Sequence, residues 1–480
     1  MIDNPENKAN NSTEKSKTTG SIPQDNPLGY APMAPLIAKY AIPSVISMLV
    51  MSLYNITDQI FIGNVIGMLG NAATNVAFPT VTLATGLSML FGIGTAANFS
   101  INQGAKRMDE AKAYIMSGMG GIMLIAILTG IFVYVFRSPI IMICGGKGNV
   151  YPYALSYLSI TCFGLPTHMF TNACANIIRA DGSPRYSMAA SMSGVLLNVF
   201  LDWLFMYPLQ MGIQGAALAT IAGQILSFTI TVLYFRHFKA FEFHFNEIRL
   251  KGSYLLTSMK TGVPNFCNHM LMMCTNIVLN NVLTVYGAMS IYGADIPLAV
   301  SGIAAKLNTI MVGFAVGTAQ GCQPIWGFNL GAKNYKRVQG AYWRAFGFAI
   351  FIGLIFFTCL QCFPESIISL FGKDEDPLYY EFAVRYLKTY MLAVAVCNIQ
   401  PVSINYFSAT GNAGQGIIVS LSRQGVFLIP LLILLPRVWG INGILYAGPI
   451  ADTSAFILSL TMVLISMRRM NAGKLDRKPV

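Results

Sequence analysis

Three aspartates lie inside long apolar runs of this sequence, where a carboxylate is unfavourable. They are Asp58, Asp202 and Asp452, and the rest of the 19 acidic residues fall in tails, in loops or at the ends of apolar runs. An aspartate at the centre of a membrane-spanning helix costs about 2.5–3.5 kcal/mol on insertion scales. Such residues therefore face protein or water, which makes them candidates for ion binding or proton transfer.

Two of these aspartates are predicted to meet. Asp58 lies in the outer part of the first apolar run, and Asp202 lies in the fifth, about 9 Å from its outer end. Asn198 shares the helical face of Asp202, and Thr220 reaches a comparable depth in the sixth run. Two close carboxylates in a low dielectric cannot both stay ionised, so they could hold a proton, or their oxygens could coordinate Na⁺. The alternative is a polar cluster that only fixes helix packing.

The third aspartate has two cations in its own half of the chain. Lys306 lies in the eighth predicted span, Arg423 in the eleventh and Asp452 in the twelfth. We expect Asp452 to be neutralised by Lys306 or by Arg423, because an unpaired buried charge is strongly destabilising. For Lys306, a structural ion pair and a contact with substrate are both open. The sequence has no P-loop, so an ATP-driven motor within the chain is not expected.

Membrane-spanning helices must position these residues. Of the 480 residues, 54% are hydrophobic and only 10% are charged, whereas charged residues make up about a quarter of soluble domains. The mean hydropathy is +0.57. Apolar runs of about 20 residues can cross a bilayer as helices. The sequence therefore predicts an all-α polytopic membrane protein with twelve spans, near 36–63, 73–98, 113–136, 151–178, 186–208, 213–235, 254–286, 296–325, 341–362, 378–401, 415–435 and 440–467.

The positive charges indicate the orientation of these spans. The net charge is +12, but Lys and Arg lie in short loops and tails between the spans, so nucleic acid is not an expected partner. They are concentrated on one side of the membrane, which predicts that both termini are cytoplasmic. Residues 1–30 are polar and are predicted to form a disordered cytoplasmic tail, and residues 468–480 a second cytoplasmic tail.

The two halves of the sequence repeat one another. Residues 94–96 (GTA) match residues 317–319 (GTA), and residues 212–215 (GIQG) match residues 440–443 (GING). Six spans thus map onto six spans in the same orientation. Two similar bundles that can rock about a central cleft are the architecture of a secondary transporter. The predicted units are an N-lobe at 31–235, a cytoplasmic linker at 236–253 and a C-lobe at 254–467.

At these segments the chain resembles the multidrug and toxic compound extrusion (MATE) family, in its bacterial DinF-like branch. The resemblance covers nearly all of residues 30 to 470, and its segments are NITDQIFIG at 55–63, NIIRADG at 176–182, LNVFLD at 197–202 and GIQGAALAT at 212–220. It implies two pseudo-symmetric six-helix lobes in a V shape and an antiporter in a bacterial cytoplasmic (inner) membrane. It also implies a cation or proton site at Asp58 and Asp202, supported by Asn198, Thr220 and Asn176.

The resemblance further implies a substrate cavity between the lobes. Some branches of the family carry acidic cation ligands in the seventh and eighth spans, whereas this chain has Asn276, Asn280 and Lys306 there, so a sodium site of that type is not expected in the C-lobe. The other cavity candidates are Tyr54, Asn55 and Met273. The expected function is export of small organic, cationic or amphipathic compounds in exchange for H⁺ or Na⁺, by a monomer that contacts membrane lipid and needs no other cofactor. The alternative is a flippase for a lipid-linked or polyisoprenoid sugar.

Overall fold

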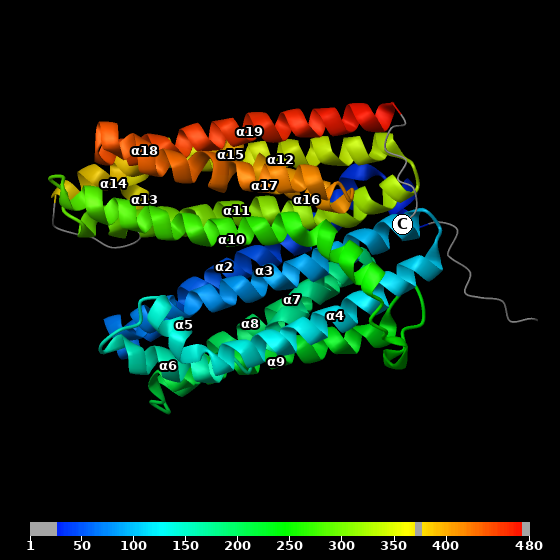
Figure 1. Cartoon of the computed structure of the whole chain (residues 1–480), viewed down its shortest axis with the longest axis horizontal. Helices are drawn as coiled ribbons and strands as arrows, with labels where there is room; N and C mark the ends of the chain where they lie inside the picture. The colour runs from blue at the N-terminus through cyan, green and yellow to red at the C-terminus, as the bar shows by residue number, and fades with distance from the viewer. Residues whose placement is uncertain (1–25, 370–376, 473–480) are drawn as a thin grey trace, which may run out of the picture.

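The computed structural model describes residues 26–369 and 377–472, and it is built from helices (Figure 1). The predicted N-terminal tail lies outside the described residues up to position 25, and its last residues form the short helix α1 (Pro27–Tyr30). The predicted C-terminal tail lies outside them from position 473.

The first half of the chain forms one bundle. Its helices are α2 (Met33–Ile66), α3 (Met68–Gly104), α4 (Met108–Val135), α5 (Arg137–Ile143), α6 (Val150–Thr161), α7 (Leu165–Ala180), α8 (Pro184–Met206) and α9 (Gly212–Tyr234). Two 3₁₀ turns, η1 (Phe235–His237) and η2 (Phe245–Glu247), lie in the linker that follows.

The second half forms the other bundle. Its elements are α10 (Gly252–Ala288), α11 (Asp295–Gly331), α12 (Tyr335–Cys362), α13 (Pro364–Ser369), α14 (Pro377–Tyr390), α15 (Val394–Cys397), α16 (Ile399–Ala409), α17 (Ala413–Leu421), the π-helix η3 (Ser422–Leu428), α18 (Ile429–Trp439) and α19 (Ile441–Asn471).

The predicted spans are present, and two of them are broken. Ten helical stretches of the described residues are long and apolar enough to cross a membrane, and the bent pair Pro377–Tyr390 and Val394–Ala409 makes an eleventh. Helices α6 and α7 occupy the range predicted for the fourth span, with a break at residues 162–164. The twelve predicted spans are thereby accounted for, and the chain is a multi-pass membrane protein.

The two bundles are the lobes of a V. Figure 1 shows them in contact near the C-terminal end of α19 and apart at the opposite end. The contact is made chiefly by two helix pairs, α3 with α10 and α2 with α11, and α3 also packs against α11. The repeat explains this arrangement, because α2 and α3 open the first half of the chain as α10 and α11 open the second.

Glycine allows the lobes to approach closely where they touch. A Cβ atom at Gly94 would overlap the carbonyl group of Ser258 in the other lobe, and a Cβ atom at Gly262 would overlap that of Leu90. Small residues at membrane helix contacts let backbones pack against each other in this way. The end of the bundle where the lobes meet carries the loops at 105–107, 181–183, 235–251 and 332–334. We name it the basic end, because most of the loop lysines and arginines lie there.

Candidate functional site

Helices α8 and α9 bring the first polar side chains of the site together. Gly194 and Gly223 face each other so closely that a Cβ on either would overlap the other's carbonyl oxygen. Asn198 packs against Gly223 from one turn beyond Gly194. Asp202 follows Asn198 by one further turn on α8, and Thr220 lies one turn from Gly223 on α9. The glycine contact therefore sets the depth at which these polar groups meet.

The second carboxyl group comes from α2, which packs along α8. The carboxyl group of Asp58 lies beside that of Asp202. The residues are buried, with exposed fractions of 9% for Asp58 and 0% for Asp202, and Asn198 is 3% exposed. The structure thus brings together the two aspartates and the two neutral groups that the sequence placed at similar depth.

The polar atoms of this cluster lack protein partners. Among the described residues, no group donates a hydrogen bond of normal geometry to either Asp202 oxygen or to Asp58 Oδ1, and the Asn198 amide and Thr220 Oγ1 are also unpaired. Buried polar atoms in native proteins are nearly always satisfied, so the atoms of this cluster are available to a proton, an ion or water. A set of carboxylate, amide and hydroxyl oxygens fits a hard cation such as Na⁺, and two adjacent carboxyls equally fit a shared proton.

Two tyrosines complete the wall of the cluster. The hydroxyls of Tyr54 from α2 and Tyr157 from α6 lie next to the Thr220 hydroxyl and close to both carboxyl groups. The sequence assigns Tyr54 to the substrate cavity, whereas the structure places it at the acid pair. Sequence reasoning misses Tyr157, because nothing in the sequence distinguishes it from the other tyrosines near the ends of spans.

Asn176 lies elsewhere, which corrects its assignment to the acid pair. Its Oδ1 accepts a hydrogen bond from Arg179 Nη2 at 2.7 Å, and the same guanidinium donates to Gln320 Oε1 of the C-lobe at 2.9 Å and to Ser187 Oγ at 3.4 Å. Ser187 is fifteen residues before Asp202 on α8, a distance of about 22 Å along the helix. Asn176 therefore belongs to the contact between the lobes near the basic end.

Three cavity candidates lie on the face of α10 that turns toward the first lobe. Near the basic end this face contacts Gly86 of α3 through Phe266 and Met270. Beyond that contact, the same helical face carries Met273, Asn276 and Asn280 by the 3.6-residue period. Asn276 and Asn280 are exposed and Met273 is partly exposed, as expected for residues beyond the point where the lobes part.

Helices α2 and α11, which also pack against each other across the two lobes, carry two further cavity candidates, Asn55 and Lys306. Gly317 of α11 packs on Val45 of α2, and Gly313 lies near Leu49. Two turns further from the basic end, the face of α11 reaches Lys306, and that of α2 reaches Asn55; both are exposed. The helical periodicity thus places these two residues and the three on α10 on the helix faces along which the two lobes diverge.

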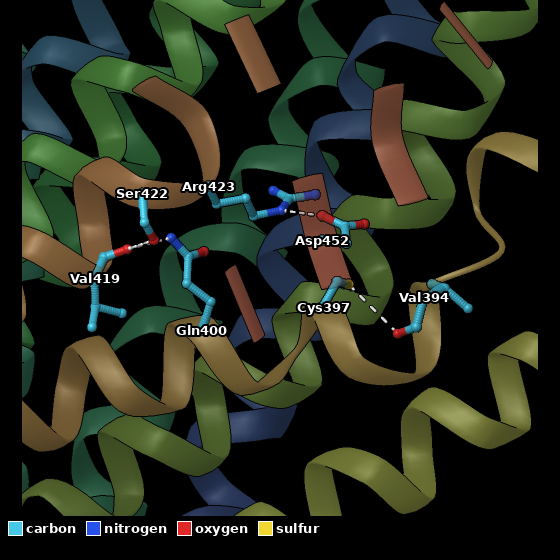
Figure 2. A network of polar contacts seen from close by, with 7 residues as sticks. All are labelled: Val394, Cys397, Gln400, Val419, Ser422, Arg423 and Asp452. Atoms are coloured by element: carbon cyan, nitrogen blue, oxygen red, sulfur yellow. Dashed lines mark hydrogen bonds and ion pairs between the residues drawn. The ribbon is translucent and has the colours of Figure 1, made fainter. Parts of the chain in front are cut away.

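Asp452 of the C-lobe pairs with Arg423. The Nε atom of Arg423 donates to Asp452 Oδ1 at 2.5 Å, and Figure 2 shows the two side chains pointing at each other with Cys397 nearby. Arg423 stands in the π-helix η3, between the broken tenth span and α19. Of the two partners open from the sequence, the structure selects Arg423.

The fold and these buried groups define a class of protein, namely a two-lobed helical transporter. The MatE family matches residues 43–204 and 269–434, one stretch in each lobe. The chain belongs to this family, the multidrug and toxic compound extrusion transporters, as the sequence segments indicated.

Relatives and solved structures agree with this membership. The chain is 24% identical to the multidrug export protein MepA of Staphylococcus aureus (strain MSSA476) over 444 residues, which covers 92% of the chain and 95% of MepA. It is 25% identical to MepA of Staphylococcus haemolyticus (strain JCSC1435) over 441 residues, 91% and 94% of the two chains. The MATE multidrug transporter DinF-BH superposes with a TM-score of 0.83 at 30% identity, covering 91% and 96%. An outward-facing MATE transporter of the MOP superfamily superposes with a TM-score of 0.84 at 20% identity, covering 92% and 96%.

Proposed function

We propose that this chain exports small organic compounds across a membrane in exchange for H⁺ or Na⁺. The observation that carries the proposal is the buried pair of Asp58 and Asp202, because three of its four carboxyl oxygens lack protein donors among the described residues. A group of this kind gains a large free energy from a proton or a cation. The proteins similar in sequence are named multidrug export proteins, which supports organic compounds as the cargo.

The proposed mechanism is alternating access. The two bundles diverge away from the basic end (Figure 1), and in the proposed mechanism the ion reaches Asp58 and Asp202 from that side. Loading this site changes the net charge of the acid pair at the contact between α2 and α8. Helix α2 also contacts α11 of the C-lobe. Movement of α2 then releases cargo from the opening, and the emptied protein closes there and opens at the basic end to reload.

The orientation belongs to the same proposal. The excess of Lys and Arg at one end supports a location of that end, and of both termini, in the cytoplasm of a bacterial cell. The open end of the V then faces outward. We further propose that the protein works as a monomer in the cytoplasmic (inner) membrane, since each chain has both lobes and the opening between them.

The opening favours organic molecules with both polar and apolar parts. Amide groups of Asn55, Asn276 and Asn280 can donate or accept hydrogen bonds, and Met273 offers an adaptable apolar contact. Lys306 adds a basic group on the exposed face of α11, which makes the cavity suited to zwitterionic and anionic as well as cationic compounds.

Replacing either acid tests the proposal. In cells of a drug-sensitive host, Asp58→Asn and Asp202→Asn should abolish export while leaving the amount of folded protein unchanged, because asparagine keeps the size but loses the exchangeable charge. Asp295→Asn, at an exposed helix terminus on the same side, is the matched control and should export normally. Full resistance in cells expressing either site variant would refute ion coupling at this pair.

Proteoliposomes identify the ion and the cargo. Uptake of a fluorescent drug should follow an imposed proton gradient or an imposed sodium gradient, applied separately, and both responses should vanish in Asp58→Asn. If neither gradient drives drug movement but a fluorescent polyisoprenoid-linked sugar changes leaflet, the chain is a flippase and the export proposal fails.

A further inference from the structure

The linker between the lobes crosses the outside of α4 and encloses a charged hollow there. The Ser117 hydroxyl of α4 donates to the Arg249 carbonyl at 3.1 Å, and Lys112 pairs with Glu247. This pairing holds the pKa of the Glu247 carboxyl below its usual range. The hollow measures about 180 Å³ and is lined by Asp109, Lys112, Ala113, Met116, Ser117, Glu247, Arg249 and Lys251.

An apolar groove lies along the same helix. It measures about 420 Å³, and its walls come from α4, α7, α9 and the linker: Met119, Gly120, Met123, Leu124, Ile127, Phe170, Phe228, Val232, Phe245 and Ile248. From Met119 to Ile127 its floor runs about 12 Å along the helix. The groove therefore begins near the basic end and points toward the middle of the membrane.

The two hollows lie on the same face of α4. On α4, Ala113 and Ser117 of the charged hollow and Gly120, Leu124 and Ile127 of the groove succeed one another at spacings of three or four residues, which is a single helical face. The linker crosses this face at Gly120, where a Cβ would contact Ile248 and Leu250. The charged hollow and the apolar groove therefore follow one another along the same face of α4, and the linker crosses this face between them.

The net charge of the charged hollow identifies a ligand class. Its three cations, Lys112, Arg249 and Lys251, exceed its two acids, Asp109 and Glu247, by one charge. One phosphodiester neutralises that excess. Basic pockets beside membrane helices on the cytoplasmic side bind anionic lipid head groups, and aromatic residues such as those of the linker favour the same interface.

We propose that this surface binds one monoanionic phospholipid of the membrane, with its phosphate in the charged hollow and an acyl chain in the apolar groove. The lipid joins α4, α7 and α9 to the linker that connects the lobes. On α9, the groove residue Phe228 lies about 12 Å nearer the basic end than Thr220 of the acid cluster. The site is separate from the proposed export pathway, so its failure and that of the export proposal are distinguishable.

Titration of the purified full chain with defined lipids tests this site. Phosphatidylglycerol added to detergent-solubilised protein should bind, by native mass spectrometry, more tightly than phosphatidylcholine. Arg249→Gln with Lys251→Gln leaves the pair of Lys112 and Glu247 intact, and it should weaken phosphatidylglycerol binding about twenty-five-fold, at roughly five-fold per basic residue near an anionic surface. Leu124→Trp, which fills the groove without changing charge, should weaken it as well.

The matched control removes two cations from the same end of the other lobe. Lys336→Gln with Arg468→Gln changes exposed residues of α12 and α19 and should bind phosphatidylglycerol as the wild type does. Equal binding by the Arg249 and Lys251 variant, or equal loss in the control, would overturn the proposal. If glycerol 3-phosphate binds as tightly as phosphatidylglycerol, the site binds phosphate without a role for the groove, and the lipid proposal fails. If phosphatidylcholine binds as tightly as phosphatidylglycerol, the argument from charge fails.

Discussion

Replacing Asp452 by asparagine tests whether the C-lobe depends on its buried ion pair. The side chains of Arg423 and Asp452 are 18% and 8% exposed, and the hydrogen bond between them is direct (Figure 2). Asparagine keeps the shape of aspartate but removes its charge. The guanidinium of Arg423 would then remain in the lobe interior beside Cys397 without its counter-ion.

The expected loss of stability follows from the burial of the ion pair. Two unit charges about 4 Å apart attract by roughly 4 kcal/mol at an effective dielectric constant of about 20. Removing one partner of a buried pair destabilises by about 3–5 kcal/mol, whereas an exposed pair contributes about 1 kcal/mol or less. A unit of 150–250 residues loses about 2–4 °C in its unfolding midpoint per kcal/mol, and the C-lobe is of that size. We therefore expect the midpoint to fall by at least about 6 °C.

Thermal unfolding of the purified variants in one detergent measures this effect. Asp295→Asn, which removes an exposed acid from the same lobe, should leave the midpoint unchanged. Arg423→Met combined with Asp452→Leu replaces both charges by apolar side chains and should recover most of the loss, because the desolvation of the pair disappears with its attraction. A midpoint of Asp452→Asn within about 2 °C of wild type, or a double variant as unstable as the single one, would refute the reasoning.

Two further predictions concern the contact between the lobes and the loop after α7. Gly317→Val places side-chain atoms against the backbone of α2 and should separate the basic ends of the lobes, seen as a longer distance between nitroxide labels on α3 and α12. Gly302→Val, with open space around it, should not change that distance, and equal behaviour of the two would contradict the packing argument. The Asp181 carboxylate accepts hydrogen bonds from the Tyr234 hydroxyl and two backbone N–H groups, yet burial raises its pKa from 3.8 to about 6. Because the folded state binds this proton more tightly, the group contributes up to about 3 kcal/mol of stability below about pH 4, and this contribution is lost as the pH rises through 6. The unfolding midpoint of the wild type should therefore fall more steeply from pH 4 to 7 than that of Asp181→Asn, and parallel profiles would show that the carboxyl does not titrate in this way.

The spans could be predicted from sequence because each is an apolar run of sufficient length, but their breaks could not. Residues 162–164 interrupt the fourth span just before Pro166, which lies in the first turn of α7 and has no backbone N–H to donate to the preceding turn. The break at residues 391–393 in the tenth span contains neither proline nor glycine. Its cause is tertiary, since this segment packs against α12 and α19, and nothing local indicates it.

The acid pair could be predicted because the depth of a residue in the membrane follows from its distance in sequence to the end of its own span. Counting residues from the ends of spans is enough to place Asp58, Asp202, Asn198 and Thr220 at one level. Rotation about the helix axis, and the choice of neighbouring helix, are set by packing. That is why Asn176, which the family resemblance implied as part of the acid pair, binds Arg179 instead, and why Tyr54, predicted for the substrate cavity, lies at the acid pair.

The two lobes accommodate buried carboxylates in opposite ways, despite their common architecture. In the C-lobe, the side chain of Arg423 supplies the cation for Asp452, so this charge is balanced in every state in which the pair stays together. In the N-lobe, Asp58 and Asp202 face each other with unpaired oxygens among the described residues. A tethered cation cannot leave, whereas a proton or Na⁺ can. Of these two clusters, only the one in the N-lobe can therefore change its charge by exchange with solution, and we expect the coupling ion to act on α2 and α8 while the C-lobe pair keeps a constant charge.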